Sequence, residues 1–95
     1  GFGSVENATW TLQGRNCKHI PTPSEDFNQT GRVVVNIIVD PAGNVTSASV
    51  GDGSNISDRE TQRLALESAR SAKFSKGETA QRGTIVYIFT DKKSN

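Results

Sequence analysis

The chain has 95 residues, 33% of them hydrophobic, and a formal net charge of +1. This length fits a single domain, which would bury only about 60–65% of the surface of its unfolded chain. Basic residues are spread along the sequence among acidic ones, which argues against nucleic acid as a partner, because that requires a clustered basic face. The sequence contains no run of about 18 apolar residues, so we expect no membrane-spanning segment in it.

Residues 1–30 are predicted to form an N-terminal arm followed by an extended segment. Phe2, Trp10 and Leu12 are large apolar residues among polar ones, and Ala8–Leu12 could form a short strand or a docking arm. The prolines at positions 21 and 23 favour extended backbone in the residues that precede them.

Residues 31–50 predict a β-hairpin. The run GRVVVNIIVD, Gly31 to Asp40, places valines and isoleucines at a period of two on one face. Further apolar residues lie on the other face, which is typical of a central strand that is partly covered on both sides. Residues 41–44, PAGN, have the composition of a tight turn, and Val45–Val50 is predicted to be the returning strand.

An amphipathic helix is predicted from about Asp58 to Lys73. Ser57 and Glu60 have the spacing of a capping box, in which the serine accepts a hydrogen bond from the amide of the glutamate. One face of the helix carries small residues, namely Ala65, Ala69 and Ala72, and the opposite face carries charges. We therefore expect the helix to lie close against a sheet.

Gly83–Phe89, GTIVYIF, is predicted to be the last strand, and residues 91–95 a tail. The predicted fold is α+β with the order β-β-α-β: a small antiparallel three-stranded sheet, order 2-1-3, with one amphipathic helix on one face. This domain would span residues 31–90. Its last strand would form an apolar edge, which we expect to be covered by the arm around Ala8–Leu12 or by a second copy of the chain.

The sequence offers no convincing catalytic, metal or cofactor motif. Cys17 and His19 are two potential zinc ligands, but a zinc site takes four, and no group that could activate the thiol is identifiable. Residues 52–55, DGSN, do not meet the spacing of a calcium-binding EF-hand. No glycine-rich phosphate-binding loop occurs. We therefore expect no enzyme activity, no metal and no cofactor.

From Arg15 to Phe89 the chain resembles the C-terminal domain of the TonB energy-transducer family (TonB/TolA-like periplasmic domains). The resemblance rests on GRVVVNIIVDPAGNV, on LALESARSAKF, on GTIVYIF, and on RNCKHIP before the first strand. It implies a periplasmic domain of a Gram-negative bacterium, anchored to the inner membrane in the full-length protein. There it would connect a proton-driven motor complex, through an anchor upstream of this sequence, to outer-membrane transporters. It also implies a possible homodimer.

The resemblance further implies how the partner is held. A short N-terminal peptide of the transporter, the TonB box, would add as a parallel strand to the last strand, and the extended segment Arg15–Pro21 would be a second contact. The partner-binding residues implied in this way are Gly83, Thr84, Ile85, Val86, Tyr87, Ile88, Phe89, Arg15, Asn16, Cys17 and Lys18. Cys17 would then be accessible to solvent.

Two other functions remain open from the sequence. The domain could be an accessory unit of a periplasmic sensor or membrane protease that acts in dimerisation or protein interaction. An enzyme is the third alternative, although the sequence provides no nucleophile–base pair, metal cluster or cofactor loop for it.

Overall fold

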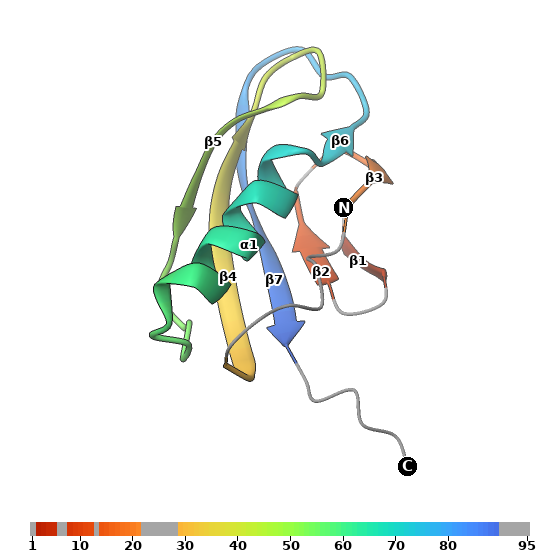
Figure 1. The fold of residues 1–95 in the computed structure, drawn as a ribbon. Helices are drawn as coiled ribbons and strands as arrows, with labels where there is room; N and C mark the ends of the chain where they lie inside the picture. Colours follow the sequence, from red (N-terminus) through yellow and green to blue (C-terminus); the bar gives the residue numbers. More distant parts are fainter. Residues whose placement is uncertain (1, 6–7, 13, 22–28, 90–95) are drawn as a thin grey trace.

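The computed structural model describes residues 2–5, 8–12, 14–21 and 29–89. They form a five-stranded antiparallel sheet, a separate two-stranded sheet and one helix that packs on the larger sheet (Figure 1). In chain order the elements are β1 (Phe2–Val5), β2 (Ala8–Thr11), β3 (Cys17–His19), β4 (Gly31–Val39), β5 (Val45–Val50), α1 (Arg59–Arg70), β6 (Lys73–Phe74) and β7 (Gln81–Phe89).

The larger sheet has the strand order β1-β2-β7-β4-β5, in which β4 lies between β7 and β5. The predicted hairpin and last strand are β4, β5 and β7, and they have the predicted neighbours. β7 pairs with β4 along its whole length, from Gly31 opposite Phe89 to Val39 opposite Gln81. The predicted three-stranded sheet was too small, because the N-terminal residues add β2 and β1 beyond β7.

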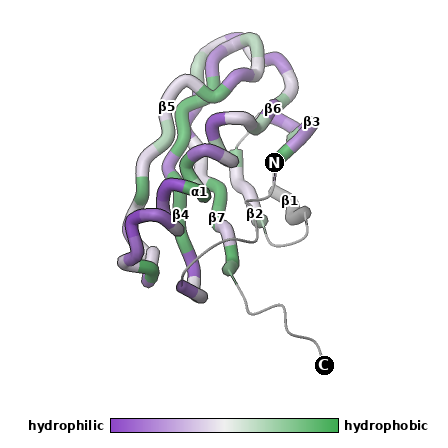
Figure 2. The backbone as a smooth tube through the Cα atoms, viewed as in Figure 1, coloured by the Kyte–Doolittle hydropathy of each residue, from purple (hydrophilic) through white to green (hydrophobic). Residues whose placement is uncertain are grey.

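The hydrophobic core lies between α1 and one face of the sheet. The inward-facing residues of β4 are all buried: Val33, Val35, Ile37 and Val39. They belong to the same buried cluster as the small residues of the helix segment, Ala65, Ala69 and Ala72. Figure 2 shows hydrophobic residues along β4 and β7 behind the helix, while the start of α1 is hydrophilic. The predicted inner face of the helix is thus confirmed.

Helix α1 is shorter at both ends than the predicted range Asp58–Lys73. Its N-cap is Asp58, whose carboxylate accepts from the backbone N–H of Thr61 at 2.9 Å and from the Thr61 hydroxyl at 2.7 Å. The predicted capping box of Ser57 and Glu60 was wrong, because a carboxylate one residue later fills that role and also suits the positive end of the helix dipole. Glu60 instead forms an ion pair with Arg63.

The helix ends at Arg70 because the chain then turns into β6, which pairs with β3. The N–H of Phe74 donates to the carbonyl of Gly43 in the β4–β5 turn at 2.9 Å. Gly43 has φ = 95°, and a Cβ there would lie only 2.1 Å from the Phe74 carbonyl oxygen. Only glycine therefore allows this turn to approach β6. In the described part of the chain, no helix has the length and apolar character needed to cross a membrane.

The contact between α1 and the sheet predicts the effect of overpacking at Ala69. Because Ala69 is 0% exposed, Ala69→Trp should lower the free energy of unfolding by about 1–3 kcal/mol. Urea denaturation measures this change, with Arg70→Trp at the neighbouring exposed position as the control. Equal stabilities of the two variants would contradict the packing described above.

Candidate functional site

The candidate site is the edge of β7 that faces away from β4. On β4, the carbonyl of Val34 accepts the N–H of Gly51 at 2.7 Å, so Val34 directs its main-chain groups toward β5. Successive residues of an antiparallel strand direct their main-chain groups to opposite sides. Because Val34 directs its groups away from β7, the residue opposite it on β7, Val86, directs its groups away from β4. Thr84, Val86 and Ile88 of β7 consequently direct their main-chain groups toward the edge, where another strand can pair with them.

β2 occupies the middle of this edge. It pairs antiparallel with β7, from Thr11 opposite Thr84 to Ala8 opposite Tyr87. The expectation that the N-terminal arm covers the last strand is thus met within one copy of the chain. The main-chain groups of Thr84 and Val86 face β2, whereas Ile88 lies beyond the residues that pair with it.

Three side chains anchor β2 in the core. Ala8, Trp10 and Leu12 alternate along the chain and are all buried. The Trp10 ring meets the Phe74 ring edge to face, with 5.7 Å between centroids and 71° between planes. Aromatic pairs of this geometry contribute about 0.5–1.5 kcal/mol beyond the burial of their area. β2 is therefore held by side-chain packing as well as by its main-chain pairing.

Gly83 allows the chain after β2 to lie against β7. A Cβ at this position would be 2.5 Å from the Thr11 carbonyl oxygen and 2.6 Å from a methyl carbon of Leu12. Such distances are below van der Waals contact, so a larger residue would push the end of β2 away from β7. Gly83 is one of the residues predicted to bind a partner, and its structural role is to let β2 lie close against β7.

Arg15 fixes the extended segment against two loops. Its guanidinium donates to the carbonyl oxygens of Asp40 (3.0 Å), Ser75 (3.0 Å) and Thr79 (2.7 Å), while Nε has no hydrogen-bond partner among the described residues. The side chain is buried, and a Cβ on Gly77 would lie 2.2 Å from its Nε. Arg15 therefore joins the end of β4 to the β6–β7 loop, and any contact it makes with a partner would go through its backbone.

The rest of the extended segment runs beside β6. The backbone N–H of Asn16 donates to Ser75 Oγ at 2.9 Å, and the Asn16 carbonyl accepts from the Ser75 N–H at 2.8 Å. Cys17 is only half-buried, and burial raises the pKa of its thiol, an effect partly offset by a backbone hydrogen bond with His19. Lys18 and His19 are exposed. No group of three or more metal-ligating side chains forms in the described part of the chain.

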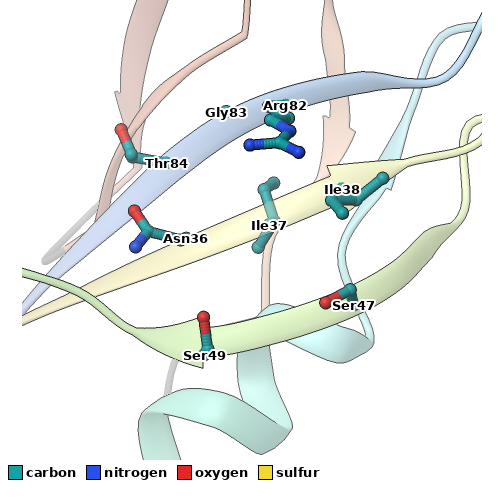
Figure 3. Close-up of a pocket in the computed structure, with 8 residues that line it drawn as sticks. All are labelled: Asn36, Ile37, Ile38, Ser47, Ser49, Arg82, Gly83 and Thr84. Carbon is teal, nitrogen blue, oxygen red and sulfur yellow. The ribbon is translucent and has the colours of Figure 1, made fainter.

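A shallow groove of about 620 Å³ lies on the sheet face opposite to the helix. Figure 3 shows that side chains of β4, β5 and β7 line it. Five of its eight lining residues are polar and lie at alternate strand positions, namely Asn36, Ser47, Ser49, Arg82 and Thr84. Sequence reasoning did not single out this groove. The period-two pattern of polar residues is its only signal, and that pattern is common to any solvent-facing sheet.

Comparison with known proteins identifies the family to which this fold belongs. The family model described as Gram-negative bacterial TonB protein C-terminal matches residues 5–90. The chain belongs to the TonB C-terminal domain family. The solution NMR structure of the Pseudomonas aeruginosa TonB CTD superposes with a TM-score of 0.68 at 17% identity, covering 99% of this chain and 98% of that one. No curated protein matches the chain.

Membership confirms the resemblance on which the sequence analysis relied. The chain is a TonB-type domain of the Gram-negative periplasm, in a family of interaction domains rather than of enzymes. Membership in this family implies an interaction with outer-membrane transporters. Four points stay predictions for this chain: which residues make such a contact, the motor complex, the homodimer and the membrane anchor.

The hydrogen bonds of Arg15 predict a large loss of stability when the guanidinium is removed. Arg15→Met keeps much of the side-chain volume but leaves three carbonyl oxygens without their donor, which should lower the free energy of unfolding by about 2–4 kcal/mol. Arg15→Lys should recover part of this loss. Lys18→Met, an exposed position of the same segment, should change stability by less than about 0.5 kcal/mol. Urea unfolding of the three variants distinguishes these effects, and an Arg15→Met protein as stable as Lys18→Met would refute the role given to Arg15.

Proposed function

We propose that this domain binds the N-terminal TonB box of an outer-membrane transporter by strand addition at β7 and transmits inner-membrane-derived energy for nutrient uptake. The observation that supports this most directly is the row of main-chain groups on Thr84, Val86 and Ile88, which all face the same edge. Strand addition draws its affinity from such main-chain groups, with about 1 kcal/mol net from each hydrogen bond, so it demands little of the partner's sequence.

The occupied edge sets a condition on this mechanism. Since β2 already pairs with Thr84–Tyr87, an incoming strand must displace β2 to reach the middle of β7. Displacement would remove Trp10 from its contact with Phe74 unless the peptide brings an apolar side chain of its own to that position. We therefore propose that the partner peptide carries apolar residues at alternate positions, which take the places of Ala8, Trp10 and Leu12.

The extended segment Arg15–Pro21 is the proposed second contact. Near its end, the hydroxyl oxygen of Tyr87 lies 3.4 Å from the carbonyl oxygen of Pro21, so the segment passes close to β7. Within it, the exposed side chains of Asn16 and Lys18 are open to a partner, Cys17 is partly open, and Arg15 is committed to the fold. A peptide that replaces β2 would thus lie near a segment that the Arg15 hydrogen bonds attach to the rest of the fold.

One observation favours the alternative, an accessory domain of a periplasmic sensor or membrane protease. A domain whose β7 edge is already filled by its own β2 needs no captured peptide to be complete. In that function, the domain would present some other surface for protein interaction, and β2 would stay in place.

A titration of the isotope-labelled domain tests the proposal. The probe is a synthetic peptide with the N-terminal residues of an outer-membrane transporter from the same bacterium, and the expected amide shifts lie on β7, β2 and Arg15–Pro21. Thr9→Pro removes an N–H that faces Val86 and weakens the cover. Because the binding-competent state is then more populated, the Kd for the peptide should fall about three- to tenfold.

Thr9→Val is the matched control, because it keeps both the N–H and the β-branched shape, and its Kd should equal that of the wild type. A Thr9→Pro protein that is folded but binds the peptide no better than Thr9→Val would show that the peptide does not compete with β2. Wild-type and Thr9→Pro proteins that both fail to bind would support the accessory-domain alternative.

A further inference from the structure

The groove on the open face of the sheet is lined by polar side chains that the fold itself does not use. The strand register arranges them in two rows across β7, β4 and β5 (Figure 3). One row consists of Thr84, Asn36 and Ser49, and in the other Arg82 and Ser47 lie on either side of Ile38. Within the described part of the chain, none of the five polar side chains forms a hydrogen bond or an ion pair. Their donors and acceptors are therefore available to a ligand in the groove.

Polar side chains just beyond the groove behave differently, because they hold the fold together. Ser54 Oγ accepts from the N–H of Val34 at 2.8 Å, and the Asn55 side chain accepts from the N–H of Arg32 at 2.7 Å. Arg32 in turn donates through its Nε to the carbonyl of Gly53 at 2.7 Å. The fold thus accounts for the polar residues around the β5–α1 loop, whereas it gives no comparable role to those that line the groove.

The charge of the groove selects an anion. Arg82 is the one charged residue among the described residues that line it, and its guanidinium has no acidic partner there. The acidic residue that follows on β4, Asp40, already accepts the N–H of Asn44 through its carboxylate at 2.8 Å. A planar guanidinium matches a carboxylate with two parallel hydrogen bonds, which makes a carboxylate the anion best suited to Arg82.

The rest of the lining indicates what else the ligand carries. Three hydroxyls and one amide can each donate and accept, as the hydroxyl groups of a ligand can. No aromatic ring lines the groove, so it offers no platform for a flat aromatic ligand. We propose that the groove binds a small carboxylate with several hydroxyl groups, of the size of one sugar acid. Arg82 would bind the carboxylate, and Asn36, Ser47, Ser49 and Thr84 the hydroxyl groups.

The size and openness of the groove set the expected affinity. Its volume of about 620 Å³ lies within the range of small-molecule sites, roughly 300–1,000 Å³. Because the groove is shallow and mostly polar, we expect a Kd in the millimolar range. Binding there does not depend on the transporter peptide, since it uses side chains on the open face of the sheet. The peptide would use main-chain groups at the edge of β7, so either site could fail without the other.

An NMR titration of the isotope-labelled domain with D-glucuronate tests the site. Saturable amide shifts are expected at the groove residues of β4, β5 and β7. D-glucose has the same ring without the carboxylate, and acetate has the carboxylate without the hydroxyl groups, so each should bind at least about tenfold more weakly. Shifts that do not saturate at the highest soluble concentration, or that lie outside the groove, would overturn the proposal. Equal binding of acetate and D-glucuronate would overturn the role given to the hydroxyl groups.

Two arginines on the same face of the sheet provide a matched pair of variants. Arg82 is exposed, so Arg82→Gln should fold normally, and the loss of its charge should raise the Kd for D-glucuronate at least about tenfold. Arg32→Gln removes a charge from the same face outside the groove and should leave this Kd unchanged. If the two variants bind D-glucuronate equally well, Arg82 is not the carboxylate-binding residue and the proposal fails.

A third variant tests the contacts to the hydroxyl groups. Ser49→Ala removes one exposed hydroxyl from the groove and should raise the Kd for D-glucuronate about threefold, the effect of one neutral hydrogen bond. The weak binding of acetate should not change, because acetate has no group to bind Ser49. A Ser49→Ala protein in which both ligands bind as they do to the wild type would contradict the placement of the hydroxyl groups along this row.

Discussion

The antiparallel pairing of β2 with β7 is the contact on which the rest of this domain depends. Without it, the longest apolar strand other than β4 would present unpaired main-chain groups to solvent, which makes a sheet edge prone to unwanted association. β2 pairs with this edge of β7 through four residues, Ala8–Thr11. Because so short a strand supplies few hydrogen bonds, its attachment relies on the packing of Trp10 against Phe74, and that contact connects the strand to the segment that follows the helix.

The same segment after the helix is held from a second direction by Arg15. Its guanidinium donates to two carbonyl oxygens of the β6–β7 loop and to one at the end of β4, so the extended segment, the hairpin turn and the β6–β7 loop share one set of hydrogen bonds. Hydrogen bonds from a charged donor are stronger than neutral ones, and their loss in a buried position is costly. If a partner peptide replaces β2, as we propose, the hydrogen bonds of Arg15 would still hold the end of β4 and the β6–β7 loop together.

The long elements were predictable because strong periodic signals determine them. The valines and isoleucines of β4 and the alanines of the helix indicated their buried faces, and both are buried as predicted. β2 was harder, since ATWT contains only one large apolar residue and its partner strand lies more than 70 residues away in the sequence. The capping role of Asp58 was missed because two adjacent residues, Ser57 and Asp58, are both of cap-forming type. The burial of Arg15 was missed because its three acceptors lie 25 or more residues away in the sequence.

The two edges of the β7-β4-β5 layer differ in a way that bears on how the domain could act. At β7 the edge is covered by a strand with large buried anchors, so access to it requires an exchange of one strand for another. At β5 the edge carries uncharged residues, and no strand of the described chain covers its outer side. Since the edges lie at opposite sides of β4, occupation of one leaves the other unchanged.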